Sequence, residues 1–416
     1  MKLIHLVRRA RKAKGIWLKG LLASTLFAPT VYAQDILESL NLNSFGDVRL
    51  RYHTVDQQAL PDTAEALSLR IKAGVEFNIF EKSTFLVEVE ASENFVEDFN
   101  DTLNGETTRP VIADPENFDI NRLQFQTELI PHTRLTLGRQ TIALDNWRFI
   151  GHWNFRQNEQ SFDAARVESQ IGPGLLNAAY VRRVQRQLGN DSPIGEFEGD
   201  STLLNYGFNT FAGRLTAFYY GLDLETGPTD DPQSGLSSAT TGVRLNGRHK
   251  WTDWGLNWEA SIAQQTDFAD NPNDYSALYA AGQLGLEYGN YDFAVKAELL
   301  GSDNGQSVQT PLGTLHRLNG AADQFLTTPD DGLRDISVSA GYKFNNIGIF
   351  EDVRVHAQYH WFESDAFNRN FGQEIDIKLS GKWKNIRLGL EYADYNEDGF
   401  GSDTQVLILS TEFHFD

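Results

Sequence analysis

The sequence predicts an all-β protein, a single antiparallel transmembrane β-barrel of about 18 strands. Three observations predict it. Apolar and polar residues alternate with a period of two in run after run, and the links between the runs are short and long in turn. No apolar run has the length that a membrane-spanning helix needs. A soluble β-sandwich is the alternative, but its strands would be shorter.

The alternating runs are about 9–11 residues long, the length that a tilted strand needs to cross a bilayer. The clearest of them span residues 67–78, 293–299, 336–344, 353–361 and 375–383. One face of each run is apolar and the other carries charged or small residues. Each strand therefore has one face for lipid and one face for water, as a membrane barrel requires.

The links between the runs support a barrel more strongly than any single run does. Eight short links lie at residues 80–82, 131–132, 172–174, 212–213, 252–253, 289–290, 345–350 and 384–385. Nine long polar links alternate with them, near residues 54–66, 93–117, 142–160, 184–201, 223–239, 266–277, 301–334, 363–373 and 394–403. Short periplasmic turns and long external loops are typical of outer-membrane barrels. Aromatic residues near the strand ends, such as Trp251 and Tyr288, fit the girdles of such barrels.

The first 33 residues predict a secretory signal peptide, which leaves residues 34–416 as the barrel. The segment carries seven basic residues and no acidic one, followed by the apolar stretch Leu21–Ala28 and the small-residue end Val31-Tyr32-Ala33. An amphipathic first helix is the alternative, but the acidic partners of its basic residues are missing. Export and a barrel together predict the outer membrane of a Gram-negative bacterium, with its lipid as a partner.

The charge of the chain argues against nucleic-acid binding. The whole chain has a net charge of -21, and loss of the signal peptide leaves 29 of the 36 basic residues against 57 acidic ones, a charge of -28. Such a surface suits contact with water and divalent cations. The chain has no cysteine, so hydrogen bonds and packing must stabilise the exported protein without disulfides.

The link at residues 142–160 differs from an ordinary surface loop. Six aromatic or basic side chains lie within ten consecutive positions, namely Trp147, Arg148, Phe149, Trp153, Phe155 and Arg156. An external loop of this composition would expose an apolar patch, which proteins rarely keep without a partner. We therefore expect the segment to fold into the lumen and narrow it, with the aromatic rings on the inner wall and both arginines facing the passage. A rigid external cap or a protein-contact loop is the alternative.

The segment around this link resembles the alginate-export family of outer-membrane proteins. The matching residues are Gly138-Arg139-Gln140, Arg148-Phe149-Ile150-Gly151, Arg156-Gln157-Asn158 and Phe162-Asp163-Ala164. The resemblance implies a single-chain, monomeric barrel whose narrow, positively charged lumen passes an anionic polyuronate. The pattern of residues alone predicts a porin, and the resemblance adds a preference for anions.

The sequence therefore predicts passive, anion-selective passage of an acidic polysaccharide or oligosaccharide. The residues expected to contact the solute are Arg70, Arg122, Arg139, Trp147, Arg148, Trp153, Arg156, Arg244 and Arg354. Arginine suits bidentate contact with carboxylates. The wall arginines could equally hold the barrel in balanced ion pairs with inward acidic residues.

A general or small-solute-selective porin is the closer alternative function. We find no catalytic motif, so an enzyme is not expected, and an outer-membrane barrel hydrolase is the remote alternative.

The link at residues 394–403 contains a partial calcium-binding motif. Its acidic and amide residues are Asp394, Asn396, Asp398 and Asp403. They match the start of a D-x-N-x-D-G loop, but the twelfth position is Gln405 instead of the bidentate glutamate. An external loop that binds Ca²⁺ and an ordinary solvated turn are both compatible with this pattern. No cofactor is otherwise required.

Overall fold

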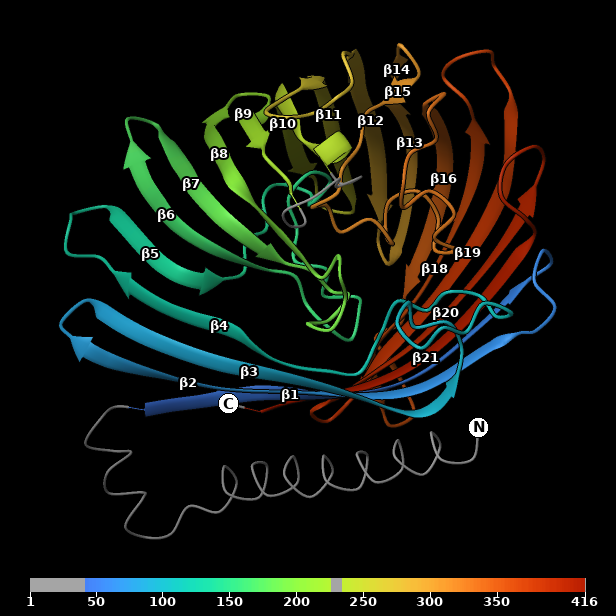
Figure 1. Cartoon of the computed structure of the whole chain (residues 1–416), viewed down its shortest axis with the longest axis horizontal. Coiled ribbons are helices and arrows are strands. Elements are labelled where there is room, and N and C mark those ends of the chain that lie inside the picture. The colour runs from blue at the N-terminus through green and yellow to red at the C-terminus, as the bar shows by residue number, and fades with distance from the viewer. Residues whose placement is uncertain (1–41, 226–233, 416) are drawn as a thin grey trace, which may run out of the picture.

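The computed structural model describes residues 42–225 and 234–415 (Figure 1). The expected signal peptide therefore lies outside the described residues. The chain forms one large antiparallel sheet that closes on itself into a barrel. Among the described residues, no helix is long and apolar enough to cross a membrane.

Eighteen strands make up the wall of the barrel. They are β1 (Leu42–Gln57), β2 (Ala64–Phe80), β3 (Ser83–Asp98), β4 (Asn117–Thr127), β5 (Thr133–Gln140), β6 (Ser161–Ile171), β7 (Gly174–Gln185), β8 (Glu196–Thr210), β9 (Gly213–Leu222), β10 (Ser238–Lys250), β11 (Trp254–Asp267), β12 (Ser276–Tyr288), β13 (Tyr291–Leu300), β16 (Leu333–Lys343), β18 (Phe350–Glu363), β19 (Asn370–Trp383), β20 (Ile386–Glu397) and β21 (Thr404–Phe415). The short elements η1 (Ser234–Leu236), β14 (Ser302–Asp303), β15 (Gln306–Ser307) and β17 (Asn346–Ile347) lie in the connections.

Each strand of the wall pairs with its neighbour in the chain, and β1 also pairs with β21. This last pairing closes the barrel, so that the sheet has no open edge to leave backbone groups unpaired in lipid. The nine long and eight short connections fall where the sequence predicted them, and the predicted strand number is confirmed. The longer connections are the external loops of an outer-membrane barrel, and the short ones are its periplasmic turns.

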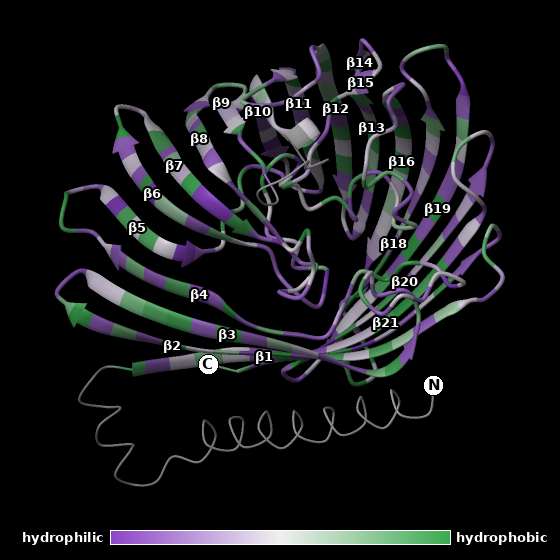
Figure 2. Cartoon of the chain, viewed as in Figure 1, coloured by the Kyte–Doolittle hydropathy of each residue, from purple (hydrophilic) through white to green (hydrophobic). Residues whose placement is uncertain are grey.

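Strand β16 shows why the alternating pattern produces a wall with two different faces. Its Asp335 and Ser337 side chains are buried, whereas Ile336 and Val338 are 52% and 40% exposed. The side chains of a strand point alternately to the two faces of its sheet, so the polar residues face the interior and the apolar ones face lipid. Apolar and polar bands consequently alternate along the strands in Figure 2.

Aromatic residues mark the periplasmic end of the lipid-facing surface. Trp251, Trp254, Tyr288, Tyr291 and Trp383 are all between 38% and 53% exposed, and they lie at strand ends next to short turns. Trp254 and Tyr288 pack together with their ring centroids 4.4 Å apart. This confirms the predicted girdle, because amphipathic rings favour the boundary between lipid and water.

Candidate functional site

The third loop, residues 141–160, turns into the lumen directly after β5. Ile142 and Ile150 are fully buried. The ring of Phe149 packs on inward-facing Tyr279 of β12, with 5.0 Å between the centroids. Burial of each such apolar side chain is worth roughly 1.5–3 kcal/mol. This apolar packing anchors the loop inside the barrel, as the sequence predicted, and not over its mouth.

The seventh loop, residues 301–332, also folds inward and joins the third loop. The Gly151 N–H donates to the Leu312 carbonyl at 2.7 Å, and the Thr314 N–H donates to the Trp147 carbonyl at 2.9 Å. A Cβ atom on Gly151 would lie 2.2 Å from the Thr314 Oγ1 atom, so this close approach of the two backbones requires glycine. We call the two loops together the plug.

The contact between the two loops has a small apolar core of its own. Trp153 is 4% exposed and packs with Leu315 and Leu318, and Leu326 covers the cluster. We expected Trp153 to pack on the inner wall of the barrel. It packs against the seventh loop instead, because that loop supplies the apolar partners inside the lumen.

Arg148 fixes the third loop to the far wall of the barrel. Its Nε atom donates to Glu298 of β13 at 2.9 Å, and its second terminal nitrogen donates to Asn319 of the seventh loop at 2.5 Å. Tyr279 donates a further hydrogen bond of 2.8 Å to the same carboxylate. Burial would lower the pKa of Arg148, but the negative charge of Glu298 has the larger effect and raises it. This ion pair is an anchor that spans the lumen.

Arg156 lies inside the plug as well. Its side chain donates to Asp323 of the seventh loop at 3.0 Å. The expectation that Arg148 and Arg156 face the passage is wrong, since the two residues are only 2% and 4% exposed. Both guanidiniums are already paired with carboxylates, Glu298 and Asp323, which hold the two loops in place.

A histidine connects the plug to the wall. His316 lies with Nδ1 2.8 Å from Asp323 Oδ1 and with Nε2 3.1 Å from Glu391 Oε1 of β20. Its ring stacks on Phe155 of the third loop at 3.4 Å. Burial of the ring would lower the pKa of His316, but the two carboxylates have the larger effect and raise it. Burial would raise the pKa of Asp323, but the nearby His316 lowers it. We call His316, Asp323 and Glu391 the histidine latch.

The end of the third loop is held by strands on the opposite side of the lumen. Arg51 of β1 pairs with Asp114 of the second loop and donates to the Phe155 carbonyl at 2.6 Å. Lys72 of β2 lies 2.9 Å from Glu159. Burial would raise the pKa of Glu159, but nearby cations, Lys72 first among them, lower it to about 2. The third loop therefore bridges the lumen from one wall to the other.

The inward-facing cations of the wall are paired with carboxylates. The pairs are Arg49 with Glu412, Arg51 with Asp114, Arg70 with Asp47 and Glu412, Lys72 with Asp47 and Glu159, Arg122 with Glu88, Arg244 with Glu259, Arg248 with Glu287, Arg354 with Asp292 and Lys378 with Glu391. The balanced network that we considered as the alternative is thus the arrangement in the structure. Of the predicted solute contacts on the wall, Arg70 is buried, Arg122 and Arg244 are partly exposed, and the Arg354 side chain is 49% exposed to the lumen.

Arg139 lies on the outer face of the barrel. It stands opposite Leu123 in the register between β4 and β5, and it shares a face with Leu137. Both leucines are lipid-facing side chains with about 40% exposure. The guanidinium pairs with Asp163 at 2.8 Å and with Asp119 at 3.3 Å. The expectation that Arg139 lines the narrowest segment is therefore wrong.

Arg317 of the seventh loop is the cation that sequence reasoning missed. Within residues 306–326, all of which the structure describes, it is the one exposed side chain. Its guanidinium lies 4.9 Å from the centre of the Trp147 ring. Among the described residues we find no ion pair for it, and burial by its surroundings lowers the pKa of Arg317 although Glu259 opposes the effect. Its signal in the sequence is a lone cation between Leu315 and Leu318.

Two cavities lie between the plug and the periplasmic end of the barrel. The larger has a volume of about 530 Å³ and extends from Arg51 and Phe155 at the plug to Glu412 near the end of β21. Its wall also carries Arg354 and His356. A neighbouring cavity of about 290 Å³ shares those two residues. Together they form a water-accessible vestibule below the plug.

The predicted calcium ligands are engaged with other groups. Asp394 lies on β20 and accepts a hydrogen bond from Tyr392, Asp398 accepts one from Asn370, and Asp403 accepts the Glu397 N–H at 2.8 Å. Within residues 42–225 and 234–415, no group of three or more histidine or acidic side chains is arranged to hold a metal ion. Calcium binding at this loop, with Asn396, stays a prediction.

The comparison with known families decides the identity of the barrel. The chain matches the alginate export family over residues 40–383. It belongs to the alginate export family. A search of curated proteins finds no match. This alginate export family member is a protein of the Gram-negative outer membrane.

Solved outer-membrane structures share the fold at low sequence identity. Pseudomonas aeruginosa OpdK with vanillate is 13% identical, with a TM-score of 0.67 over 90% of this chain and 98% of that chain. Acinetobacter baumannii OccAB4 is 15% identical, with a TM-score of 0.69 over 90% and 98% of the two chains. A BenF-like porin from Pseudomonas fluorescens Pf-5 is 13% identical, with a TM-score of 0.68 over 90% and 99%. These similarities, together with the family, indicate an outer-membrane channel.

Proposed function

We propose that this channel is anion-selective and passes uronate oligomers, with Arg317 and Trp147 as the contact in its narrowest part. The observation that carries the proposal is the unpaired, exposed guanidinium of Arg317 on the plug. A guanidinium without a carboxylate partner can take a solute carboxylate as a bidentate ligand. The Trp147 ring beside it offers an apolar surface for a sugar ring.

The paired cations of the wall contribute less to selectivity than their number suggests. Arg244, for example, has a bidentate partner in Glu259, with bonds of 2.9 and 2.6 Å. Such a pair presents little net charge to a passing ion. Arg317 has no such neutralising partner among the described residues, so its field extends into the passage. In a confined site of lower dielectric constant, one free charge changes the energy of a passing ion more than several balanced ion pairs do.

The acidic net charge of the chain does not contradict anion selectivity. Many of the aspartates lie in external loops outside the plug, for example Asp101 and Asp270. Charges farther from the passage than about one Debye length, ~8 Å at physiological salt, are largely screened. The local charge near the plug therefore decides which ions enter.

Reversal potentials across a salt gradient test the selectivity directly. We expect wild-type channels in planar bilayers to prefer chloride over potassium, and Arg317→Gln to lower that preference about fivefold. This factor follows from ~1 kcal/mol, the interaction of two unit charges 4 Å apart in a water-like dielectric. Lys384→Gln is the matched control, because Lys384 also lies over a tryptophan ring, 5.2 Å from the centre of Trp383, but in the short turn between β19 and β20. Cation selectivity that is unchanged in Arg317→Gln would refute both the anion preference and the role of Arg317.

A porin for small carboxylates is the second candidate, and the plug favours it. Two inward-folded loops leave less room for a polymer than an open 18-stranded barrel would. The similar OpdK structure contains vanillate, a small aromatic carboxylate. Block of the ion current by oligouronates and by vanillate, measured on the same channel, separates the two. Block by vanillate alone would favour the small-solute porin, and block by oligouronates alone would favour the uronate channel.

A further inference from the structure

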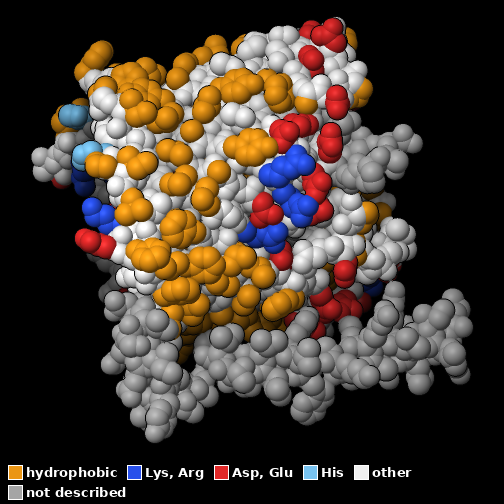
Figure 3. Space-filling view, turned by 60° about the vertical axis from the view of Figure 1, so that its left-hand side comes forward, with side chains coloured by type: hydrophobic (Ala, Val, Ile, Leu, Met, Phe, Trp, Pro, Cys, Tyr) orange, Lys and Arg blue, Asp and Glu red, His pale blue; other side chains and the backbone are white. Residues whose placement is uncertain are grey.

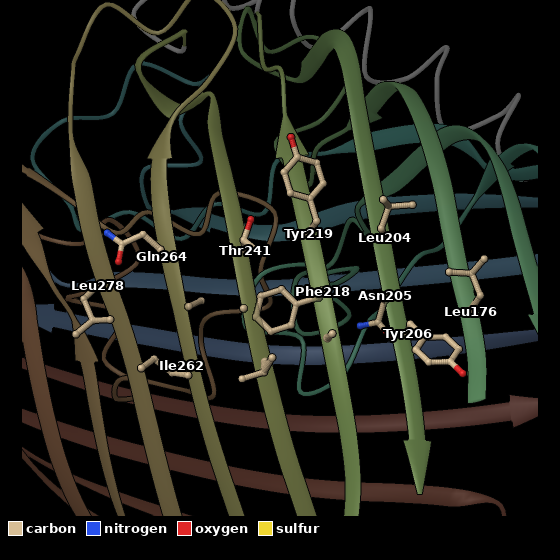
Figure 4. Close-up of a pocket in the computed structure, with 14 residues that line it drawn as sticks. Leu176, Leu204, Asn205, Tyr206, Phe218, Tyr219, Thr241, Ile262, Gln264 and Leu278 are labelled. Carbon is tan, nitrogen blue, oxygen red and sulfur yellow. The ribbon is translucent and has the colours of Figure 1, made fainter. Parts of the chain in front are cut away.

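A concave surface lies on the outer wall of the barrel, away from the lumen. It is a groove of about 630 Å³ across β7 to β12. Figure 4 shows its side chains on adjacent strands. Leu204, Val243, Ile262 and Leu278 line it and are each between 41% and 53% exposed. The groove therefore opens toward lipid.

The depth of the groove comes from a small residue in a row of large ones. Tyr206, Ala217, Val243 and Ile262 stand opposite one another in the registers of β8 to β11. Ala217 leaves a depression between the larger side chains on either side. A depression this size in the hydrocarbon layer suits an acyl chain, which can fill it without losing other contacts.

The next row toward the external end is polar at its centre. Tyr219, Thr241 and Gln264 face outward in direct register between Leu204 and Leu278. The Gln264 side chain donates to a neighbouring serine. Within the residues that the structure describes, we find no hydrogen-bond partner for the Tyr219 or Thr241 hydroxyl. Hydroxyls at the boundary between lipid and water are free to bind water, a lipid headgroup or an ester.

Charged side chains lie beyond this polar row on β7 and β8. Arg182 pairs with Asp200 at 2.9 Å, and both side chains are 63% exposed. Arg183 pairs with Glu198 close by. Asp200 lies four residues from Leu204 along β8, roughly 13 Å at the rise of a strand. Figure 3 shows such basic and acidic side chains directly beside the apolar band of the barrel.

We propose that this face binds a phosphorylated glycolipid of the outer leaflet. An acyl chain fills the groove over Ala217, the Tyr219 and Thr241 hydroxyls bind the linker region, and Arg182 and Arg183 bind the phosphates. Exposed ion pairs such as these are worth little by themselves, so the guanidiniums can exchange carboxylates for phosphate. The released carboxylates and the phosphates share Mg²⁺, which oxygen ligands of both kinds bind.

Binding of two lipids to the purified full-length barrel in detergent tests the proposal. The probes are fluorescent rough-type lipopolysaccharide and fluorescent phosphatidylethanolamine, both with Mg²⁺. We expect lipopolysaccharide to bind wild type about tenfold more tightly, the factor of one charge-assisted contact. Ala217→Trp should weaken the binding of both lipids, because the larger side chain fills the groove. The Arg182→Gln, Arg183→Gln double variant should weaken the binding of lipopolysaccharide alone. Val338→Trp, on the lipid face of β16, is the matched control and should change neither affinity.

Three results would overturn the proposal. Equal affinity of the wild type for the two lipids would show that the headgroup is not recognised. Unchanged binding in Ala217→Trp, or in Ala217→Leu if the tryptophan variant does not fold, would show that the groove is not the site. Cross-linking of two barrels through this face, with loss of lipid binding, would assign it to a second copy of the chain. Lipid binding is measured without ion flow, so its failure is distinct from a failure of the selectivity proposal.

Discussion

The histidine latch makes the plug sensitive to pH. Both ring nitrogens of His316 face carboxylate oxygens, Asp323 at 2.8 Å and Glu391 at 3.1 Å. A neutral imidazole has a single N–H, so only the doubly protonated ring can donate to both acceptors. On loss of the proton, one nitrogen lone pair points at a buried carboxylate. The latch therefore holds the seventh loop to the wall through both of its hydrogen bonds only while His316 is charged.

The sign of the pH dependence follows from the raised pKa of His316. A group whose pKa is higher in the folded state than in the unfolded state stabilises the folded protein. This stabilisation is complete at a pH below the pKa of the unfolded state, which is 6.5 for histidine. The stabilisation is lost as the pH rises through the pKa of His316 in the folded state. Other charged or titratable groups near the ring do not remove this effect: Arg156 pairs with Asp323, Lys378 pairs with Glu391, and the buried ring of His53 lies close by.

We estimate the cost of removing His316 from these contacts. Loss of one partner of a buried ion pair costs about 3–5 kcal/mol when the remaining charge has no other partner. Here Asp323 keeps Arg156 at 3.0 Å and Glu391 keeps Lys378 at 2.7 Å. Each carboxylate therefore stays neutralised, and we expect His316→Gln to cost about 1–3 kcal/mol, the value of the hydrogen bonds to charged groups that it loses.

Protease cleavage of the seventh loop measures the release of the latch. We expect cleavage of the wild-type barrel to rise as the pH increases from 6 through the raised pKa of His316. The His316→Gln variant should be cleaved faster at pH 6 and should show little further change. A matched variant, His414→Gln, alters an exposed histidine on β21 and should follow the wild type. A wild-type loop whose cleavage does not change with pH would refute the latch.

Three further predictions concern the plug and the external loop. Deletion of Asn146–Asn154 should raise single-channel conductance severalfold, and unchanged conductance would place the constriction elsewhere. Arg148→Ala should lower the free energy of unfolding in urea by about 1–3 kcal/mol, because Glu298 loses its guanidinium but keeps Lys296 at 2.9 Å; a change below ~1 kcal/mol would mean that the anchor is dispensable. If the external loop binds Ca²⁺, the melting temperature should rise with calcium, and the Asp394→Asn, Asp398→Asn double variant should abolish that rise.

The barrel could be predicted from the sequence because its signals are local. A period of two sets which face each side chain occupies, and the turn and loop lengths set the order of the strands. The same rule would have placed Arg139 correctly, since Leu135, Leu137 and Arg139 alternate onto one face of β5. Its basic charge suggested the lumen, but its position in the strand determines that it faces outward.

The arrangement inside the barrel could not be predicted in the same way. The entry of the third loop into the lumen followed from its excess of aromatic rings, which need burial. The roles of its arginines depend on partners far along the chain. Glu298 is 150 residues from Arg148, and Asp323 is 167 residues from Arg156. No periodicity or spacing in the sequence indicates such pairs. Residue type alone therefore could not distinguish an arginine that is held in an ion pair from one that is free to contact the solute.

The position of Arg317 connects the selectivity of the channel to the latch. It follows His316 directly in the chain, and the hydrogen bond from the Leu318 N–H to the Leu315 carbonyl, 2.8 Å long, makes this part of the seventh loop a tight turn. A turn fixed at His316 also fixes where Arg317 meets Trp147. Release of the latch at high pH should therefore withdraw the free guanidinium from the passage. We expect the anion preference to fall as the pH rises in the wild type and to stay low throughout in His316→Gln, as measured by reversal potentials. A preference that is independent of pH in the wild type would mean that Trp147 holds Arg317 in place without the latch.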